Sequence, residues 1–399
     1  MDKKLRANIW KFYLFNIFSG FVLYYAIDKI FMEARGLSVT EIAIVLIVYD
    51  VLFIILEVPS GALADRWSRK YILALNMVFF ILNTLAWVLA HDIRLFLLGS
   101  MAASVHMALH SGTDTSFLYD TLKQLKRDGD YEKTLGNSIF WSNLTAILAG
   151  VTGGVIADRL GLELPFWITI GFSFIAVFIA LSFTEPEIHR TTGALNYWTH
   201  IIETGKLLWK HPFIKHVIVF WVIMGVTLML IDEYGQLYFR GIGIPIYMLG
   251  ILAAVGSGIE AITGKFAYRL SKFSRRRVFT IALIISIAGF IVVGLTKTWY
   301  GVVFAFLPWL AYYSILPLFL NDLHKELPSG QRATGESFTS LLRSLVFIPA
   351  GLGFGIMADR ISIFMAFLAI GIVLAIYLIV FLFASYRRFS DYYPRKSEL

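Results

Sequence analysis

The chain has 399 residues, of which 58% are hydrophobic and only 16% are charged, and its net charge is +8. A typical soluble domain is about 45–50% apolar and about 25% charged, so this composition excludes a soluble globular protein and also a disordered one. Because there are no cysteines, disulfides, thiolate nucleophiles and cysteine metal sites are excluded as well. We therefore expect an integral membrane protein.

Twelve stretches are long and apolar enough to cross a bilayer as helices, which takes about 20 residues each. In chain order they are residues 8–31, 41–65, 71–90, 93–118, 135–157, 164–183, 212–239, 245–268, 278–296, 300–324, 334–358 and 362–385. Long apolar runs such as Ile281 to Val293 disfavour the short alternating strands of an outer-membrane barrel. The pattern predicts an all-α membrane protein with twelve transmembrane helices.

Lysine and arginine indicate the orientation of these spans. Of the 35 basic residues, 27 precede the first span, lie in the even-numbered loops or follow the last span, whereas the odd-numbered loops hold six. Basic residues accumulate on the cytoplasmic side of a membrane. We expect a multi-pass protein of the cytoplasmic (inner) membrane with both termini in the cytoplasm. The net charge then requires no nucleic-acid partner.

The longest loop divides the chain into two halves that resemble each other. We expect six-helix bundles at residues 1–185 and 212–385, a cytoplasmic linker at 186–211 and a cytoplasmic tail at 386–399. Asp120 matches Asp322, and Ala157-Asp158-Arg159 matches Ala358-Asp359-Arg360, with offsets near 200 residues. Two such bundles can rock about a site held between them near the bilayer midplane. The duplication therefore predicts alternating access.

The loop between spans 2 and 3 reads Gly61-Ala-Leu-Ala-Asp65-Arg66-Trp-Ser68-Arg69-Lys70. It resembles the signature Gly-x-Leu-Ala-Asp-Arg-x-Gly-Arg-Lys of the major facilitator superfamily, with Ser68 in place of the second glycine. A weaker copy occurs at residues 264–277, where that family keeps its degenerate second copy. The resemblance covers essentially the whole chain and points to prokaryotic, efflux-like members with two pseudo-symmetric bundles.

The resemblance implies that this loop is a gate. Asp65 would dock on the positive N-terminus of span 11, near Arg332, and hold the cytoplasmic side closed. Glu336 would pair with Arg66 or Arg69. The alternative is that the basic residues are topology signals only. The predicted gate residues are Gly61, Asp65, Arg66, Arg69, Lys70 and Glu336.

Ionisable groups inside membrane spans are costly and usually functional. Glu57 and Glu260 occupy matching places in spans 2 and 8, where a carboxyl group either carries a proton or pairs with a structural partner such as Lys265 or Arg343. Span 4 carries three polar residues at i, i+4 and i+8, which places them on one helical face. That face suits cavity lining, a proton relay, structural hydrogen bonds or, least favoured, a metal site. The candidate proton-coupling residues are Glu57, Glu260, His106, His110 and Asp114, and the last three are the metal candidates.

The candidate substrate cavity combines the remaining charges in the spans with aromatic and amide side chains. Aromatic rings suit amphipathic or planar organic substrates, although aromatic enrichment is common in membrane proteins. The candidate cavity residues are Tyr24, Tyr25, Asp28, Trp141, Asn143, Trp221, Asp232, Glu233, Tyr312, Tyr313 and Arg343.

These features predict a secondary transporter, not an enzyme, that moves a small organic solute, with export and proton coupling favoured. The span-5 stretch at residues 149–154 lacks the proline usual in drug–proton antiporters, which weakens a drug-exporter assignment. Uptake of a metabolite, coupling to sodium and divalent-metal export remain alternatives, as do a transport-inactive sensor and a membrane-embedded enzyme. We expect a monomer whose partners are the solute, the coupling ion and lipid. No cofactor is expected, because the nucleotide-binding loop of ATP-driven pumps is missing.

Overall fold

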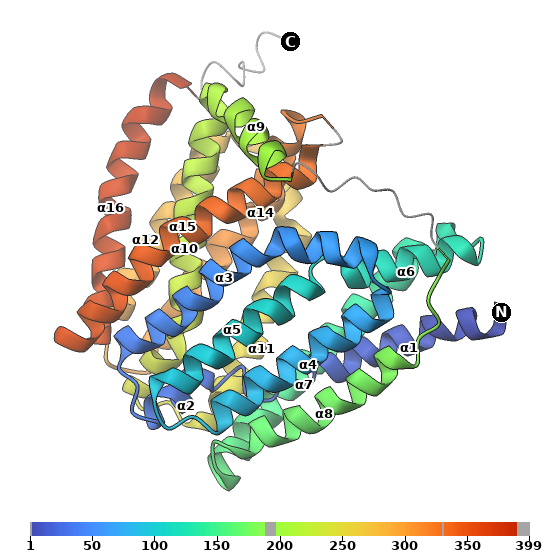
Figure 1. Cartoon of the computed structure of the whole chain (residues 1–399). Helices are drawn as coiled ribbons and strands as arrows, with labels where there is room; N and C mark the ends of the chain where they lie inside the picture. The colour runs from blue at the N-terminus through green and yellow to red at the C-terminus, as the bar shows by residue number, and fades with distance from the viewer. Residues whose placement is uncertain (1, 188–196, 329–330, 389–399) are drawn as a thin grey trace. The chain divides into compact units, whose positions relative to one another are not determined.

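The computed structural model describes residues 2–187, 197–328 and 331–388, and these form helices and turns without a strand (Figure 1). The chain divides into two compact units. Unit 1 contains residues 1–37, 44–195 and 245–254, and unit 2 contains residues 38–43, 196–244 and 255–399. Each unit is thus one half of the chain plus a short segment from the other half.

Unit 1 is an all-helical bundle. Its elements are α1 (Asp2–Gly20), α2 (Asp28–Ala34), most of α3 (Val39–Arg66), α4 (Arg69–Val88), α5 (Ile93–His110), α6 (Thr113–Gln124), the 3-10 helix η1 (Asp128–Asp130), α7 (Tyr131–Leu160), α8 (Leu164–Leu181) and the first part of α11 (Ile246–Phe266). Helix α4 packs against α5 and α8 and buries Asn76, Asn83 and Thr84 along with its apolar side chains.

Unit 2 repeats the helical architecture. It contains α9 (Tyr197–Lys210), α10 (Pro212–Gly241), the remainder of α11, the 3-10 helix η2 (Ala267–Lys272), α12 (Arg275–Leu295), α13 (Tyr300–Ala305), α14 (Leu307–Lys325), α15 (Arg332–Arg360), α16 (Ile363–Arg388) and the first turn of α3. Helix α9 lies within the predicted linker, and most of the predicted tail, residues 389–399, lies outside the described residues.

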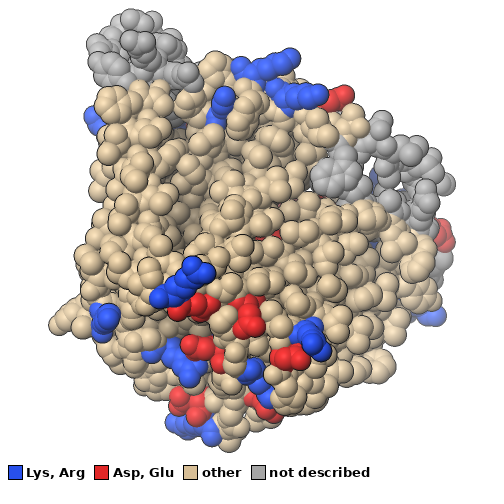
Figure 2. Space-filling model, turned by 60° about the vertical axis from the view of Figure 1, so that its left-hand side comes forward, with Lys and Arg blue, Asp and Glu red and all other residues tan. Residues whose placement is uncertain are grey.

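Eleven helices in the described chain are long and apolar enough to cross a membrane. On the face in Figure 2, charged side chains gather near two opposite edges, and the surface between them is largely uncharged. The first predicted span, 8–31, is not one helix, because the chain leaves helical geometry between α1 and α2. At this break the Leu23 amide donates to the Thr169 hydroxyl at 3.1 Å. This hydrogen bond replaces the one that the Leu23 amide would make within a continuous helix.

Close helix packing in unit 1 depends on glycine. A Cβ on Gly153 of α7 would collide with the backbone of Leu23, and a Cβ on Gly250 of α11 would collide with the backbone of Gly150. Gly154 lies against the first turn of α11. Small residues allow this approach of helix backbones in membranes, so α7 holds both the break after α1 and the start of α11.

Span 4 is also interrupted. The continuous helix predicted for residues 93–118 ends at His110 in α5, and α6 begins at Thr113. Gly112 between them has φ +74°, a left-handed conformation that glycine adopts at little cost. The expected single helical face carrying His106, His110 and Asp114 is therefore wrong, since Asp114 belongs to a different helix.

Candidate functional site

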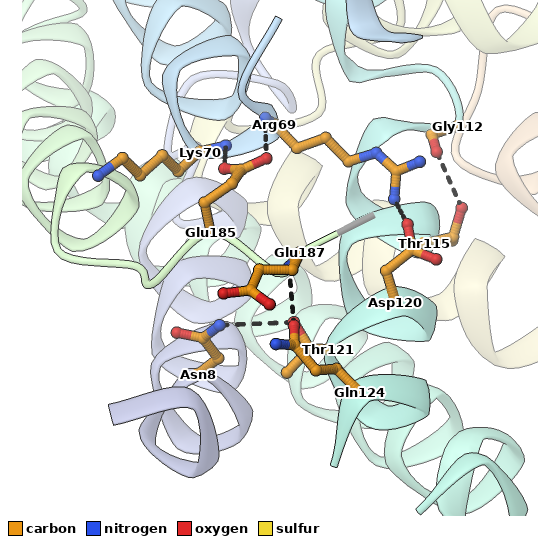
Figure 3. Close-up of polar contacts among 10 residues, drawn as sticks. All are labelled: Asn8, Arg69, Lys70, Gly112, Thr115, Asp120, Thr121, Gln124, Glu185 and Glu187. Atoms are coloured by element: carbon orange, nitrogen blue, oxygen red, sulfur yellow. Dashed lines mark hydrogen bonds and ion pairs between the residues drawn. The ribbon is translucent and has the colours of Figure 1, made fainter. Parts of the chain in front are cut away.

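The signature loop of unit 1 is anchored by a carboxylate from the segment that follows α8. Glu185 accepts hydrogen bonds from the Ser68 hydroxyl at 2.5 Å, the Arg69 amide at 2.8 Å and the Lys70 amide at 3.1 Å (Figure 3). These amides are at the start of α4, where a helix has unpaired N–H groups and a positive dipole end. Glu185 thereby caps α4 from a segment more than a hundred residues away.

The side chain of Arg69 points in the opposite direction and forms an ion pair with Asp120 of α6 (Figure 3). Both side chains are mostly buried, with 16% and 17% of their surface exposed. Nearby, Asn8 of α1 donates to the Thr121 hydroxyl at 3.4 Å and to the Thr184 carbonyl at 2.7 Å. The network ties α1, α4, α6 and the chain after α8 into one polar cluster.

Unit 2 contains the same ion pair in a more buried form. The Arg275 guanidinium donates from Nε to Asp322 Oδ2 at 2.6 Å and from Nη2 to Oδ1 at 3.0 Å. The exposed fractions of the two side chains are 5% and 1%. Ser274 caps α12 just as Ser68 precedes α4, so the Ser-Arg dipeptide recurs at the start of both helices.

Arg275 was not predicted as a site residue. It lies in the weaker copy of the signature loop, at residues 264–277, and the aspartate partners make Arg275 the counterpart of Arg69. The recurring Ser-Arg dipeptide was the available signal.

The gate residues are only partly described. The side chains of Gly61, Asp65 and Arg66 lie outside the described residues, although their backbone continues α3. Glu336 of α15 forms a hydrogen bond with His324 Nε2 at 2.6 Å. Arg69 is paired with Asp120 in this structure, so the predicted pairing of Glu336 with Arg69 is not formed, and the side chain of the alternative partner, Arg66, is not described.

The first turn of α3 is held within unit 2 by Asp359, at the end of α15. The Asp359 carboxylate accepts from the Val39 amide at 2.9 Å and from the Thr40 amide at 2.8 Å. A Cβ on Gly355, one turn earlier in α15, would meet the Thr40 Cα at 2.8 Å. Gly355 lets the backbones of α15 and α3 approach, and Asp359, four residues later, accepts from the free amides of Val39 and Thr40. We call this contact the Asp359 clasp.

The clasp repeats a pattern present elsewhere in the sequence. Gly61 precedes Asp65, Gly154 precedes Asp158 and Gly355 precedes Asp359, each by four residues. In the signature loop the glycine and the aspartate belong to the family motif, whereas the ends of α7 and α15 match in sequence through Ala157-Asp158-Arg159 and Ala358-Asp359-Arg360. The role of Asp359 at the end of α15 depends on which helix N-terminus packs beside it. The sequence spacing alone does not give that neighbour.

An aromatic stack with an arginine beside it lies inside unit 2. Trp221 of α10 stacks on Tyr312 at 4.3 Å and on Phe319 at 4.2 Å between ring centroids, both from α14. Nη1 of Arg343, from α15, donates to the Tyr312 hydroxyl at 3.3 Å. Three of the predicted cavity residues are therefore in direct contact.

The carboxylates of unit 2 lie near this stack. Tyr313 of α14 interacts with Glu260 of α11, and Asp232 contributes to the same electrostatic environment. Asp232 is exposed, whereas Glu233 is half-buried. The structure thus assembles Arg343, Tyr312, Tyr313 and Glu260 into one cluster from three helices.

The polar residues of unit 1 are more dispersed. His106 accepts from or donates to no other side chain, and its Nδ1 donates to the Asn76 carbonyl at 3.1 Å in the described part of the chain. The rings of His106 and His110 are nearly parallel, 6.2 Å apart. No group of three His, Asp or Glu side chains with metal-binding geometry occurs among the described residues.

The remaining cavity candidates differ in exposure. Tyr24 is 1% exposed, stacks on Phe166 at 4.3 Å and bonds the Thr84 hydroxyl, so it is a core residue. Asp28 is buried and paired with Lys29 at 2.7 Å. The cavity candidates Tyr25, Trp141 and Asn143 are exposed. Glu57, a proton-coupling candidate, is half-buried.

Apolar helices of spanning length and matching ion pairs in two units define a membrane protein built from two similar halves. The sequence model of the Major Facilitator Superfamily matches residues 9–351. The chain therefore belongs to this superfamily and is a multi-pass membrane transporter.

Related proteins agree with this assignment. The chain is 25% identical over 352 residues to the inner membrane transport protein YajR of Escherichia coli (strain K12), covering 84% of this chain and 74% of that protein. The structure is similar to that of the nucleoside transporter NupG, with a TM-score of 0.76, 16% identity and coverage of 97% of this chain and 100% of the other. It is also similar to a bacterial homologue of the human lysosomal transporter Spinster, with a TM-score of 0.74, 15% identity and 96% coverage of both chains. These structural likenesses establish the fold alone.

Proposed function

We propose that the protein is a secondary active transporter that moves a small organic solute across the cytoplasmic membrane by alternating access. The observation that carries the proposal is that both units hold ionisable side chains within their apolar helices: Glu57 and His106 in unit 1, Glu260 and Arg343 in unit 2. Such groups are costly in a bilayer and are kept for substrate or ion pathways. The relatives support transport, and the protein acts as a monomer in this proposal.

In this cycle the two ends of α3 act as gates. With both termini in the cytoplasm, Asp65 lies at the inner end of α3 and the Asp359 clasp at the outer end. Each aspartate faces a helix N-terminus when its own side is closed, and releases it when that side opens. Support comes from the shared spacing of Gly61 with Asp65 and of Gly355 with Asp359.

Proton coupling is the favoured energy source, and export the favoured direction. Purified protein reconstituted in vesicles with an imposed pH gradient should accumulate its solute against a concentration gradient. A protonophore should abolish this accumulation, because the driving force is lost. If accumulation persists with the protonophore and depends on a sodium gradient, sodium is the coupling ion. If the solute moves in the direction opposite to export, the protein catalyses uptake.

Asp65→Asn should slow transport without loss of folded protein. A charge at a helix N-terminus contributes up to about 2 kcal/mol, or a factor of about 30 in the gate equilibrium. Initial rates of solute flux into vesicles measure the effect. Asp130→Asn, at an exposed residue paired with Arg127, is the matched control and should transport normally. Normal turnover in Asp65→Asn would contradict the gate role.

Divalent-metal export is the second candidate, because His106 and His110 are adjacent. Zinc should then raise the melting temperature of the purified protein, and His106→Ala should remove that increase. If zinc has no effect on the wild type, metal export is excluded. A folded protein that moves no solute in either direction would favour the sensor or membrane-enzyme alternatives.

A further inference from the structure

We propose that Arg343 binds the oxyanion group of the transported solute, which makes the substrate a small organic anion carrying a carboxylate or a phosphate monoester. The inference deepens the proposed transport function and rests on it. It assigns a chemical class to the substrate and a specific anchor in unit 2.

The hydrogen-bonding capacity of Arg343 is largely unused. A guanidinium carries five N–H donors, and in the described chain that of Arg343 makes one hydrogen bond, to the Tyr312 hydroxyl at 3.3 Å, and no ion pair. Its Nε is buried without a hydrogen-bond partner. Leaving a buried donor of a charged group unpaired is energetically costly.

The position of Arg343 in α15 prevents an easy escape of the charge to water. It is 11 residues after Arg332 and 17 before Arg360, which at 1.5 Å per residue places it roughly 16 Å from the nearer helix end. Arginines close to a helix end extend their side chains to the interface, but this distance exceeds that reach. The half-buried guanidinium thus lies within the apolar length of the helix, where an oxyanion supplies two acceptors in the geometry of its fork.

The surroundings hold the arginine in place before any ligand arrives. A Cβ on Gly225 of α10 would lie 2.6 Å from Arg343 Cδ, so the glycine provides the space through which the side chain passes. Trp221 and Tyr312 are each 5% exposed, and Trp221 stacks on both Tyr312 and Phe319, so the tyrosine that bonds Arg343 belongs to a buried aromatic stack. A preorganised cation of this kind reduces the ordering cost of binding.

Glu260, the carboxylate of the same cluster, makes a cationic substrate the competing possibility. Glu260 already interacts with the Tyr313 side chain, whereas Arg343 Nε has no partner. The unsatisfied group is thus the cation, which favours an anionic ligand.

Four probes of one size separate the possibilities. Benzoate, phenyl phosphate, benzamide and benzylammonium are titrated calorimetrically into the full-length protein in nanodiscs. We expect benzoate or phenyl phosphate to bind and the amide and the cation to bind at least about tenfold more weakly. The better of the two anions identifies carboxylate or phosphate as the group recognised.

Variants then locate the anion. Arg343→Gln should weaken anion binding by about tenfold or more, since one partner of a buried charge pair is removed, and Arg343→Lys should weaken it less. Lys265→Gln removes an exposed cation on α11 and should leave binding unchanged. Gly225→Ala should weaken binding by displacing Arg343, whereas Gly258→Ala, with open space around it, should not.

Several results overturn the inference. These are preferential binding of benzylammonium or benzamide, absence of anion binding to the wild type, or equal anion affinity in Arg343→Gln and in the wild type. Vesicle transport of neutral or cationic solutes by the same preparation would leave the proposed transport function intact. If anions bind at Arg343 but no solute is transported, the proposed transport function is contradicted and the anion site stands.

Discussion

Asp322→Ala is expected to destabilise the protein by about 3–5 kcal/mol, because it leaves the Arg275 guanidinium charged and unpaired in the interior. The pair has two short hydrogen bonds, and its side chains are 5% and 1% exposed. Unfolding in mixed micelles titrated with sodium dodecyl sulfate measures the change in free energy. Replacing both partners, Arg275→Met with Asp322→Leu, should recover most of the loss, because no charge then remains buried.

The matched control is the corresponding pair in unit 1. Asp120→Ala leaves Arg69 without its ion-pair partner. The side chains of Arg69 and Asp120 are 16% and 17% exposed. Water reaches this site more easily, so a smaller loss, about 1–3 kcal/mol, is expected. Equal losses for both substitutions would show that burial does not determine the energetics of these pairs, and failure of the double variant to recover would show that packing is responsible.

Cross-linking the Asp359 clasp is expected to stop transport almost completely. The Asp359 carboxylate reaches the amide of Thr40 at 2.8 Å, and the chain contains no cysteine. Thr40→Cys with Asp359→Cys therefore supplies the only thiols in the protein. A short bifunctional thiol reagent should join the start of α3 to the end of α15, and a reducible reagent should restore flux on reduction.

Each single-cysteine variant provides the control for the reagent and should keep its flux after treatment. Asp359→Asn should favour opening by up to about 1 kcal/mol, or about fivefold, since it removes the charge of an exposed carboxylate that faces the helix N-terminus. Asp158→Asn is the matched substitution at the equivalent place in α7, where the described residues provide no hydrogen bond to the carboxylate, and its effect should be smaller. Full transport by the cross-linked protein would exclude the clasp from the cycle.

Individual elements show where sequence analysis succeeds and where it does not. Long apolar runs predict helices such as α10 and α16 well, because the cost of exposing backbone in lipid leaves little choice of structure. The breaks after Gly20 and at Gly112 were missed, since both lie inside apolar stretches. At the first break the hydroxyl of Thr169 and the space beside Gly153 compensate the lost helical pairing, and both come from distant helices.

The site residues follow the same division. Arg343, Tyr312 and Trp221 were predicted as cavity residues from their place in the spans, and the structure brings them into contact. Tyr24 had the same sequence features, but its ring is buried on Phe166 in the core. Hydropathy and residue type do not distinguish a core tyrosine such as Tyr24 from a cluster tyrosine such as Tyr312, because an aromatic ring is favourable in a membrane helix at either place.

Composition alone determined that the protein resides in a membrane, and the uneven distribution of its 35 basic residues predicts its orientation. Membrane residence and orientation both follow from the free energy of transferring each segment from water to lipid, which depends on that segment alone. Tertiary structure alone decided that Arg275 meets Asp322, that Asp359 holds the first turn of α3 and that Arg343 keeps an unpaired N–H group. Those outcomes depend on distances between helices far apart in the chain, and a buried charge or amide is stabilised only by the group that packing places beside it.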